Sequence, residues 1–199
     1  MNVHTHQSLH MHTAGFADPA KNISVLGVDP GMFVADFGAG SGAYTIAIAR
    51  ALRGSGRVYA VDVQKDLLRR IKTETHSRGL DSVVEIIWGD VEERGGSKIA
   101  DGAVDLVLIS NLLFQLPGKR AALIEARRIL KPTGRVAIIE WSDSFGGMGP
   151  HKDDVVKRDV ALELVSSNGF EFVHGFAAGA HHYGLIVRPV AKSIQIQVS

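Results

Sequence analysis

Short apolar runs alternate with amphipathic segments along most of the chain. The runs are rich in β-branched residues, which is typical of buried strands, and the segments between them place apolar residues at helical spacing. The predicted strands are Val34–Asp36, Arg57–Val61, Val83–Trp88, Val104–Ile109 and Arg135–Trp141, and the predicted helices are Tyr44–Leu52, Gln64–Arg78, Arg120–Leu130 and Asp153–Ser167. Strands that alternate with helices predict a parallel sheet that is covered on both faces.

The C-terminal part of the chain breaks this alternation. Two strands are predicted at Phe170–His174 and Tyr183–Val187, separated by a loop of Gly, Ala and His with no helix between them. Without a crossover helix, two consecutive strands pair as an antiparallel hairpin. We therefore predict an α/β fold: a Rossmann-like, doubly wound, mostly parallel sheet that ends in an antiparallel C-terminal hairpin.

Composition narrows the class of protein. The 199 residues suit one domain with a full core, and 45% apolar and 22% charged residues are ordinary for a globular protein. The net charge is +1 with no Lys/Arg cluster, so we expect no nucleic-acid partner. The chain has no cysteine, which excludes disulfides and thiolate metal sites. No run is long enough for a membrane span and the first residues lack a signal-peptide core, so we expect a cytoplasmic location.

Three glycines at alternate positions follow the first predicted strand, in Asp36-Phe37-Gly38-Ala39-Gly40-Ser41-Gly42. A strand, a glycine turn and a helix place backbone without side chains at the carboxyl end of a parallel strand, where open α/β sheets bind cofactors. The glycines could instead serve only close packing of strand and helix. We favour a cofactor that carries a nucleoside.

Three acidic residues bear on which cofactor binds, although the first does not separate the two candidates. Asp62 ends the second strand, twenty positions after Gly42, where a carboxylate binds the ribose hydroxyls of either NAD or S-adenosylmethionine. Asp90 follows the third strand and could reach an adenine amino group. Asp36 would repel a pyrophosphate but attract an ammonium or sulfonium cation, which favours S-adenosylmethionine.

Simpler interpretations of these positions stay open. Asp62 could cap the following helix, and Asp90 could serve only its turn. The side chain of Asn111 could serve only to fix the conformation of its loop. We expect Trp88 and Phe114 to belong to the core rather than to stack on a cofactor.

Together, these residues resemble the class I S-adenosylmethionine-dependent methyltransferases, over roughly residues 31–188. The glycine motif is similar to that family's first motif, and Asp62 to its ribose-binding acid. Asp90 and Val91 match the pair that holds adenine, and the segment Ser110–Gln115 matches the motif after strand four. Leu130-Lys131-Pro132-Thr133-Gly134-Arg135 resembles the Leu-Lys-Pro-Gly-Gly turn of the branch with quinone-biosynthesis and arsenite methyltransferases, with Thr133 in place of a glycine.

The resemblance implies a seven-stranded methyltransferase fold and S-adenosylmethionine as cofactor. The implied cofactor-binding residues are Asp36, Gly38, Gly40, Gly42, Asp62, Val63, Asp90, Val91 and Asn111. It also divides the chain into a His-rich leader with a capping helix (residues 1–30), a methyltransferase domain (31–189) and a C-terminal tail (190–199).

Catalytic residues are less constrained, because the family supplies no universal one. The segment Glu140–His151 is long and Gly-rich, as substrate loops often are. Asp143 and His151 in this segment are candidate acids or bases. The hairpin segment His181-His182-Tyr183 is a second possible source, with His181 as the candidate there. All three could equally be polar residues of surface loops.

The N-terminus holds His4, His6, His10 and His12. Such a cluster could bind a divalent metal, and His10 and His12 could approach His151 and His181, but a leader without function is the simpler interpretation, and we predict no metal site. Asp18 and Pro19 predict the start of a helix, as N-cap and first residue.

Three functions remain. We favour a methyltransferase that acts on a small molecule; the missing cysteines argue against arsenite as the acceptor. A non-catalytic S-adenosylmethionine-binding sensor or partner subunit is the alternative. An NAD-dependent oxidoreductase is disfavoured by Asp36 and by the terminal hairpin. The sequence names neither the acceptor atom nor the oligomeric state.

Overall fold

The computed structural model describes residues 17–145, 147 and 149–191, and it confirms the predicted alternation. The helices are α1 (Pro19–Leu26), α2 (Ala43–Ala51), α3 (Lys65–Ser77), α4 (Lys119–Ile129) and α5 (Arg158–Ser167), with a short 3₁₀ helix, η1 (Leu113–Gln115). The strands are β1 (Phe33–Phe37), β2 (Arg57–Asp62), β3 (Val84–Trp88), β4 (Val104–Ser110), β5 (Leu130–Trp141), β6 (Phe170–Gly179) and β7 (His182–Pro189).

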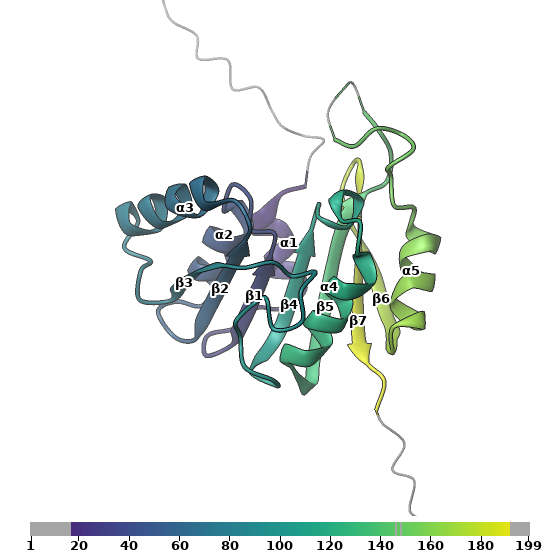
Figure 1. Ribbon diagram of the computed structural model, residues 1–199. Coiled ribbons are helices and arrows are strands. Elements are labelled where there is room, and N and C mark those ends of the chain that lie inside the picture. Colours follow the sequence, from purple (N-terminus) through teal and green to yellow (C-terminus); the bar gives the residue numbers. More distant parts are fainter. Residues whose placement is uncertain (1–16, 146, 148, 192–199) are drawn as a thin grey trace, which may run out of the picture.

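The strands form one seven-stranded sheet in the order β3-β2-β1-β4-β5-β7-β6 (Figure 1). Strands β1 to β5 pair in parallel, β7 pairs antiparallel with β5, and β6 pairs antiparallel with β7. The predicted fold class, including the terminal antiparallel hairpin, is confirmed.

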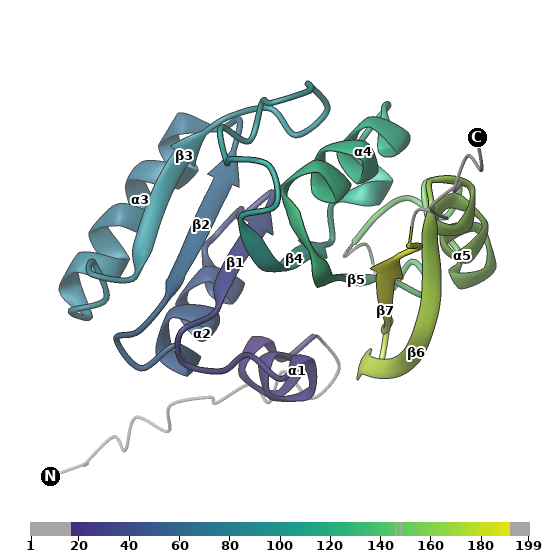
Figure 2. The same cartoon turned by 90° about the horizontal axis from the view of Figure 1, so that it is seen from below.

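Helices cover both faces of the sheet. Figure 2 shows α1, α2 and α3 on one side and α4 and α5 on the other. Alternate strand residues face the two sides: Val34 and Leu108 pack in the cluster that contains α1 and α2, whereas Phe37 and Ile109 pack in the cluster that contains α4 and α5. This alternation of buried side chains is why the strands appear as continuous apolar runs.

The strand order creates a switch point between β1 and β4. From β1 the chain proceeds outward to β2 and β3, then returns to place β4 on the other side of β1. The loops at the carboxyl ends of β1 and β4 therefore diverge, and ligands of open α/β sheets bind in the crevice that results.

Helix α1 begins as predicted. The Asp18 carboxylate accepts hydrogen bonds from the backbone N–H groups of Ala20 and Lys21, and Pro19 occupies the first helical position. The helix buries Ile23 and Leu26. This positions its N-terminus beside the carboxyl ends of the strands.

The prediction of a helix over Asp153–Ser167 was wrong in its first part, because α5 begins at Arg158. Residues 152–154 form a turn and 155–157 have no regular structure. Val156 is buried, and its carbonyl accepts a hydrogen bond of 2.7 Å from the Tyr183 hydroxyl. This tertiary hydrogen bond holds Val156 outside the helix, and Lys157, with an extended backbone, is the N-cap residue of α5.

The C-terminal strands are longer than predicted. Strand β6 continues to Gly179 and β7 starts at His182, so only Ala180 and His181 connect them. The segment Lys131–Gly134, predicted as a turn, protrudes from the edge of the β4–β5 ladder, because Leu130 pairs with Val104 and Arg135 already pairs with Leu106.

The two aromatic predictions had different outcomes. Phe114 packs against the core cluster, as predicted. Trp88 was predicted to belong to the core, and this was wrong: it is 52% exposed at the end of β3. Its indole N–H donates to the Val63 carbonyl, and the Lys65 ammonium lies 4.0 Å from the ring centroid. Hydrogen bonding and a cation–π contact, rather than burial, hold Trp88 in place.

Some predictions fall outside the described residues. These are the four N-terminal histidines, with any metal site that they form, and residues 192–199 of the tail. The division of the chain at residues 30 and 189 stays a prediction. Within the ranges that the structure covers, no helix could cross a membrane, and no group of three or more His, Asp or Glu side chains is arranged to hold a metal ion.

Candidate functional site

The glycine loop follows β1 and is fixed to the end of β2. The N–H groups of Gly38 and Ala39 both donate to the Val61 carbonyl, at 2.9 and 3.1 Å. Gly38 and Gly42 have φ angles of +67° and +81°, and a Cβ atom at either would lie 2.7 Å from a side-chain carbon of Leu112 or Ile71. Both the left-handed backbone and the close packing therefore require glycine.

Asp62 joins the glycine loop to the turn after β2. Its two carboxylate oxygens accept from the N–H of Gly40 at 2.9 Å and from the N–H of Gln64 at 2.8 Å. The residue is 7% exposed. Gln64, not Asp62, is the N-cap residue of α3, so the predicted capping role reduces to one hydrogen bond in the turn. Each oxygen keeps a lone pair for a ligand.

A two-part cleft surrounds the glycine loop. The β3-side half has a volume of about 300 Å³, and the β7-side half about 340 Å³. The β3-side half is lined by Gly38, Gly40, Val61, Asp62, Val63, Gln64, Gly89, Asp90, Val91, Glu92, Leu112, Gln115 and Leu116. The β7-side half is lined by Ala17, Pro19, Asp36, Gly38, Ala39, Gly40, Ser41, Ala43, Tyr44, Ser110, Asn111, Gln115, Trp141 and His182. Gly38, Gly40 and Gln115 line both halves, so the two halves lie side by side.

Asp36 contributes a buried carboxylate to the β7-side half. It is 2% exposed and accepts a hydrogen bond of 2.6 Å from the Thr45 hydroxyl on α2. Burial raises the pKa of Asp36 to about 7; the Thr45 hydrogen bond opposes this shift and the charge of Asp62 adds to it. A cation bound in the cleft would favour the ionised form.

Three further predicted residues line the β3-side half. Val91 is buried, whereas Val63 is 55% exposed. Asp90 is exposed, and one of its carboxylate oxygens accepts from the N–H of Glu92 at 2.9 Å. Asp90 therefore serves its turn and also lines the cleft. The structure brings Asp62 and Asp90 together in this half and places Asp36 in the other.

The segment after β4 separates the two halves and is held by Glu140. One carboxylate oxygen of Glu140 accepts from the N–H groups of Leu112 and Leu113, at 2.8 and 2.6 Å. The residue is fully buried, and burial raises its pKa to about 7. Asn111 lies in this segment with a φ angle of +51° and lines the β7-side half. Glu140 thus fixes a wall that both halves share.

The three catalytic candidates lie outside the cleft lining. The imidazole Nδ1 of His181 is 2.8 Å from the Asp143 carboxylate, and the ring stacks on Phe145 with 4.0 Å between centroids. These contacts fix the start of the loop after β5 to the hairpin. His151 is exposed and does not line the cleft. None of the three lines either half of the cleft, so this geometry lends no support to the role of acid or base predicted for them, which stays a prediction.

Sequence reasoning named His182 only as part of a segment that could supply an acid or base, and it missed several other residues of the cleft. Trp141 and His182 pair across β5 and β7, and their rings lie 4.2 Å apart at the β7-side half. The sequence did contain a signal for Glu140. An acidic residue within the apolar run Ala137–Trp141 indicates a buried carboxylate that needs hydrogen-bond partners. Gln64 and Tyr44 carried no comparable signal, because loop and helix positions become cleft walls only in three dimensions.

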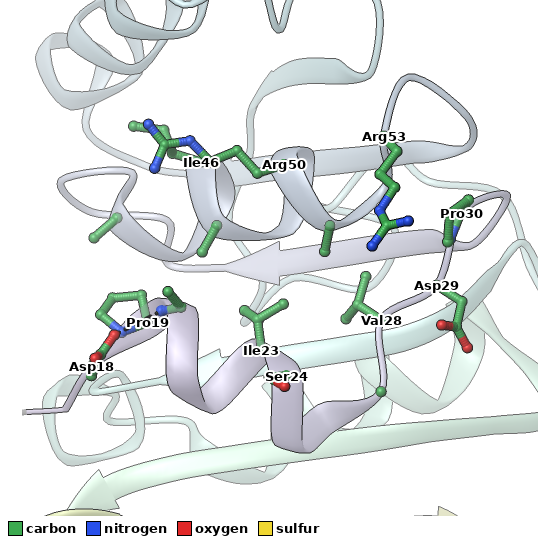
Figure 3. Close-up of a pocket in the computed structure, with 15 residues that line it drawn as sticks. Asp18, Pro19, Ile23, Ser24, Val28, Asp29, Pro30, Ile46, Arg50 and Arg53 are labelled. Carbon is green, nitrogen blue, oxygen red and sulfur yellow. Dashed lines mark hydrogen bonds between the residues drawn. The ribbon is translucent and has the colours of Figure 1, made fainter.

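A groove of about 600 Å³, larger than either half of the cleft, lies elsewhere, between α1 and α2 (Figure 3). Ile23 and Val28 lie between the helices, and Arg50 and Arg53 project from α2 and the turn after it. The groove contains neither the glycine loop nor the three acidic residues. Its charged residues are exposed and of both signs, so we assign it no ligand.

Known proteins share the fold and the motifs. A family model described as a methyltransferase domain matches residues 35–138. The ubiquinone/menaquinone biosynthesis C-methyltransferase UbiE of Shewanella oneidensis is 30% identical over 120 residues, which cover 60% of this chain and 47% of that protein. UbiE of Burkholderia cenocepacia is 32% identical over 123 residues, 62% of this chain and 49% of that protein. The chain spans about half the length of these relatives.

Solved structures show the same fold. A SAM-dependent methyltransferase from Aquifex aeolicus has a TM-score of 0.78 at 24% identity, over 86% of this chain and 89% of that one. The [4+2]-cyclase SpnF has a TM-score of 0.72 at 17% identity, over 86% of this chain and 81% of that one. At these identities, the similarity concerns the fold alone.

Proposed function

Because this chain belongs to the methyltransferase domain family, we propose that its cleft binds S-adenosylmethionine and that it transfers the methyl group to a small-molecule acceptor. The observation that carries this proposal is the row of carboxylates towards the carboxyl ends of three adjacent strands: Asp36 on β1, Asp62 on β2 and Asp90 after β3. A row of acids suits a nucleoside linked to a cation and opposes one linked to phosphates.

The residues fit this cofactor in both halves of the cleft. In the β3-side half, Asp62 can accept from both ribose hydroxyls, and Asp90 with the Val91 N–H can recognise adenine. In the β7-side half, Asp36 can pair with the ammonium group while the glycine-loop backbone follows the methionine chain. Val63 and Asn111 complete the proposed set beside Gly38, Gly40 and Gly42.

The cofactor supplies an electrophilic methyl group on a sulfonium centre. The protein's contribution is to hold donor and acceptor in line and to exclude water. Glu140 fixes the segment that bounds both halves, and Trp141, Tyr44 and Pro19 give the β7-side half apolar surface for an organic acceptor. This half is where we propose that the acceptor binds.

Calorimetric titration with S-adenosylmethionine, S-adenosylhomocysteine and NAD tests the proposal. We expect binding of both sulfur compounds with micromolar affinity, and none of NAD, because Asp36 would repel its pyrophosphate. Binding of NAD alone would reject the proposal in favour of an oxidoreductase. Binding of none of the three would reject a nucleoside cofactor.

One observation favours a second candidate function. The cyclase SpnF shares this fold, so the fold also supports chemistry other than methyl transfer. A protein that binds S-adenosylmethionine without transferring its methyl group is the alternative. Tight cofactor binding, without S-adenosylhomocysteine formation over a broad panel of small acceptors, would favour it.

Substituting Asp36 by asparagine is expected to weaken cofactor binding while it stabilises the folded protein. At pH 8 we expect cofactor affinity to fall about tenfold, since the ammonium group loses its ionised partner. Because the folded-state pKa of Asp36 lies well above 3.8, ionising it destabilises the folded protein increasingly as pH rises towards 7. The variant is therefore expected to be more stable than wild type at pH 8, by roughly 1–3 kcal/mol. Calorimetry and urea unfolding measure the two effects.

The pH dependence of ligand affinity provides the control for this prediction. In wild type, the affinity for S-adenosylhomocysteine should increase between pH 6 and about 7, as Asp36 ionises, and then level off. In Asp36→Asn this increase should be absent. The same pH dependence in both proteins would contradict the assigned role of Asp36.

A further inference from the structure

His182 stands out among the buried polar residues. It is 4% exposed at the start of β7 and lines the β7-side half of the cleft. Neither ring nitrogen has a hydrogen-bond partner within the part of the chain that the structure describes. Its neighbour His181, by contrast, has its ring engaged by Asp143 and Phe145.

An unpartnered buried imidazole destabilises a protein, because its nitrogens lose their hydrogen bonds to water and gain nothing in return. Such groups occur in native structures mainly where a ligand or function explains them. The amide oxygen of Asn111 is likewise buried without a partner and lines the same half. Two unpartnered groups therefore converge on one part of the cleft.

The surroundings of His182 suit contact with an uncharged organic molecule. Trp141 packs against its ring at a tilt of 41°, and Tyr44 and Pro19 also line this half. Burial lowers the pKa of His182; His181 adds to the shift and Asp143 opposes it. A neutral imidazole has one nitrogen that accepts a hydrogen bond and one that donates.

We propose that His182 accepts a hydrogen bond from the methyl acceptor and so selects acceptors that carry an O–H or N–H group. This inference rests on the proposed function, because it assumes that the cofactor's methyl group is presented to the β7-side half. It assigns a specificity-determining residue that the sequence motifs did not identify. A purely structural histidine would contact the core only and would not discriminate between ligands.

Two analogues of S-adenosylmethionine, in which a nitrogen atom replaces the sulfonium sulfur, test the proposed role of His182. They can be used although the acceptor itself is unidentified. One carries a hydroxypropyl group in place of the methyl group, and the other a butyl group, which has the same number of heavy atoms but no hydroxyl. The cofactor part anchors both, and only the first delivers a hydroxyl into the β7-side half. We expect wild type to bind the hydroxypropyl analogue about 5- to 10-fold more tightly, which is the effect of one hydrogen bond.

Three variants complete the experiment. In His182→Phe, which keeps a ring beside Trp141 but has no nitrogen, we expect the hydroxyl preference to disappear. In His182→Gln, which retains a hydrogen-bonding group, we expect partial preference. In His181→Gln, the matched control in the same turn, we expect the full preference, since the His181 ring contacts Asp143 and not the cleft.

The outcomes are distinguishable. Equal affinity of wild type for the two analogues would overturn the inference, even if the His182 variants failed to fold. So would a preference that persists in a His182→Phe protein that still binds S-adenosylhomocysteine. Failure of wild type to bind S-adenosylhomocysteine would overturn the proposed function itself, whereas normal binding without hydroxyl preference would overturn only the role of His182.

Discussion

Substituting Asp62 by asparagine is expected to raise the Kd for S-adenosylhomocysteine by about 100-fold or more. A carboxylate that accepts from both ribose hydroxyls contributes two charge-assisted hydrogen bonds, each of roughly 1.5–3 kcal/mol. The asparagine amide also directs N–H groups at a position where the Gly40 or Gln64 N–H already donates. The variant therefore weakens the ligand contact and the glycine loop together. Calorimetric titration measures the loss.

Asp66→Asn is the matched control for this experiment. Asp66 lies in the first turn of α3, close to Asp62 in sequence, but its exposed side chain contacts Arg69 and lines neither half of the cleft. We expect unchanged affinity. Circular dichroism at the titration temperature should show both variants folded. An Asp62→Asn protein that is folded and binds within threefold of wild type would contradict the ribose-binding role.

Glu125→Gln is expected to produce the largest loss of stability. Glu125 on α4 is fully buried and accepts from Gly95, Ser97 and Arg128, with distances of 2.5–3.1 Å. Removing its charge leaves a largely buried guanidinium without its main partner, and breaking such a pair costs about 3–5 kcal/mol. For a chain of this size, that corresponds to a decrease in Tm of roughly 6–15 °C, measurable by calorimetry.

The pH dependence of this loss has a defined direction. Hydrogen bonds from Arg128 and Ser97 outweigh the desolvation of Glu125 and lower its pKa to about 2. Its contribution is complete above pH 4.5 and decreases as pH falls towards 2. The difference in stability between wild type and variant should thus be largest near neutral pH and decrease in acid. Glu163→Gln, on the exposed surface of α5, should change stability by less than about 0.5 kcal/mol.

The succession of strands and helices along the chain could be predicted from the sequence, because buried parallel strands leave a strong apolar signal. The start of α5 did not, since its position depends on a hydrogen bond between the Tyr183 hydroxyl and the Val156 carbonyl. The exposure of Trp88 could not be predicted either, because it also depends on tertiary contacts. An apolar residue at the end of a strand resembles a core residue until Lys65 and the Val63 carbonyl are seen to hold it at the surface.

The cofactor-binding residues could be proposed from spacing because they cluster at strand ends, and strand ends are visible in the sequence. The residues of the proposed acceptor side could not be identified from spacing. His182 is one position from His181, and the pleat of β7 decides which of the two faces the cleft. Only the pairing of His182 with Trp141 makes that choice, and it depends on the register between two strands that are distant in the sequence.

The sheet order also has a consequence for how the protein is made and changed. Every residue that lines the β3-side half lies within the first 116 residues, whereas the β7-side half depends on Trp141 and His182. During synthesis, all lining residues of the β3-side half are therefore translated before Trp141 and His182, although Glu140, which accepts from the N–H of Leu112 in that lining, comes later. Substitutions at Trp141 or His182 can therefore change the lining of the β7-side half while every lining residue of the β3-side half is retained.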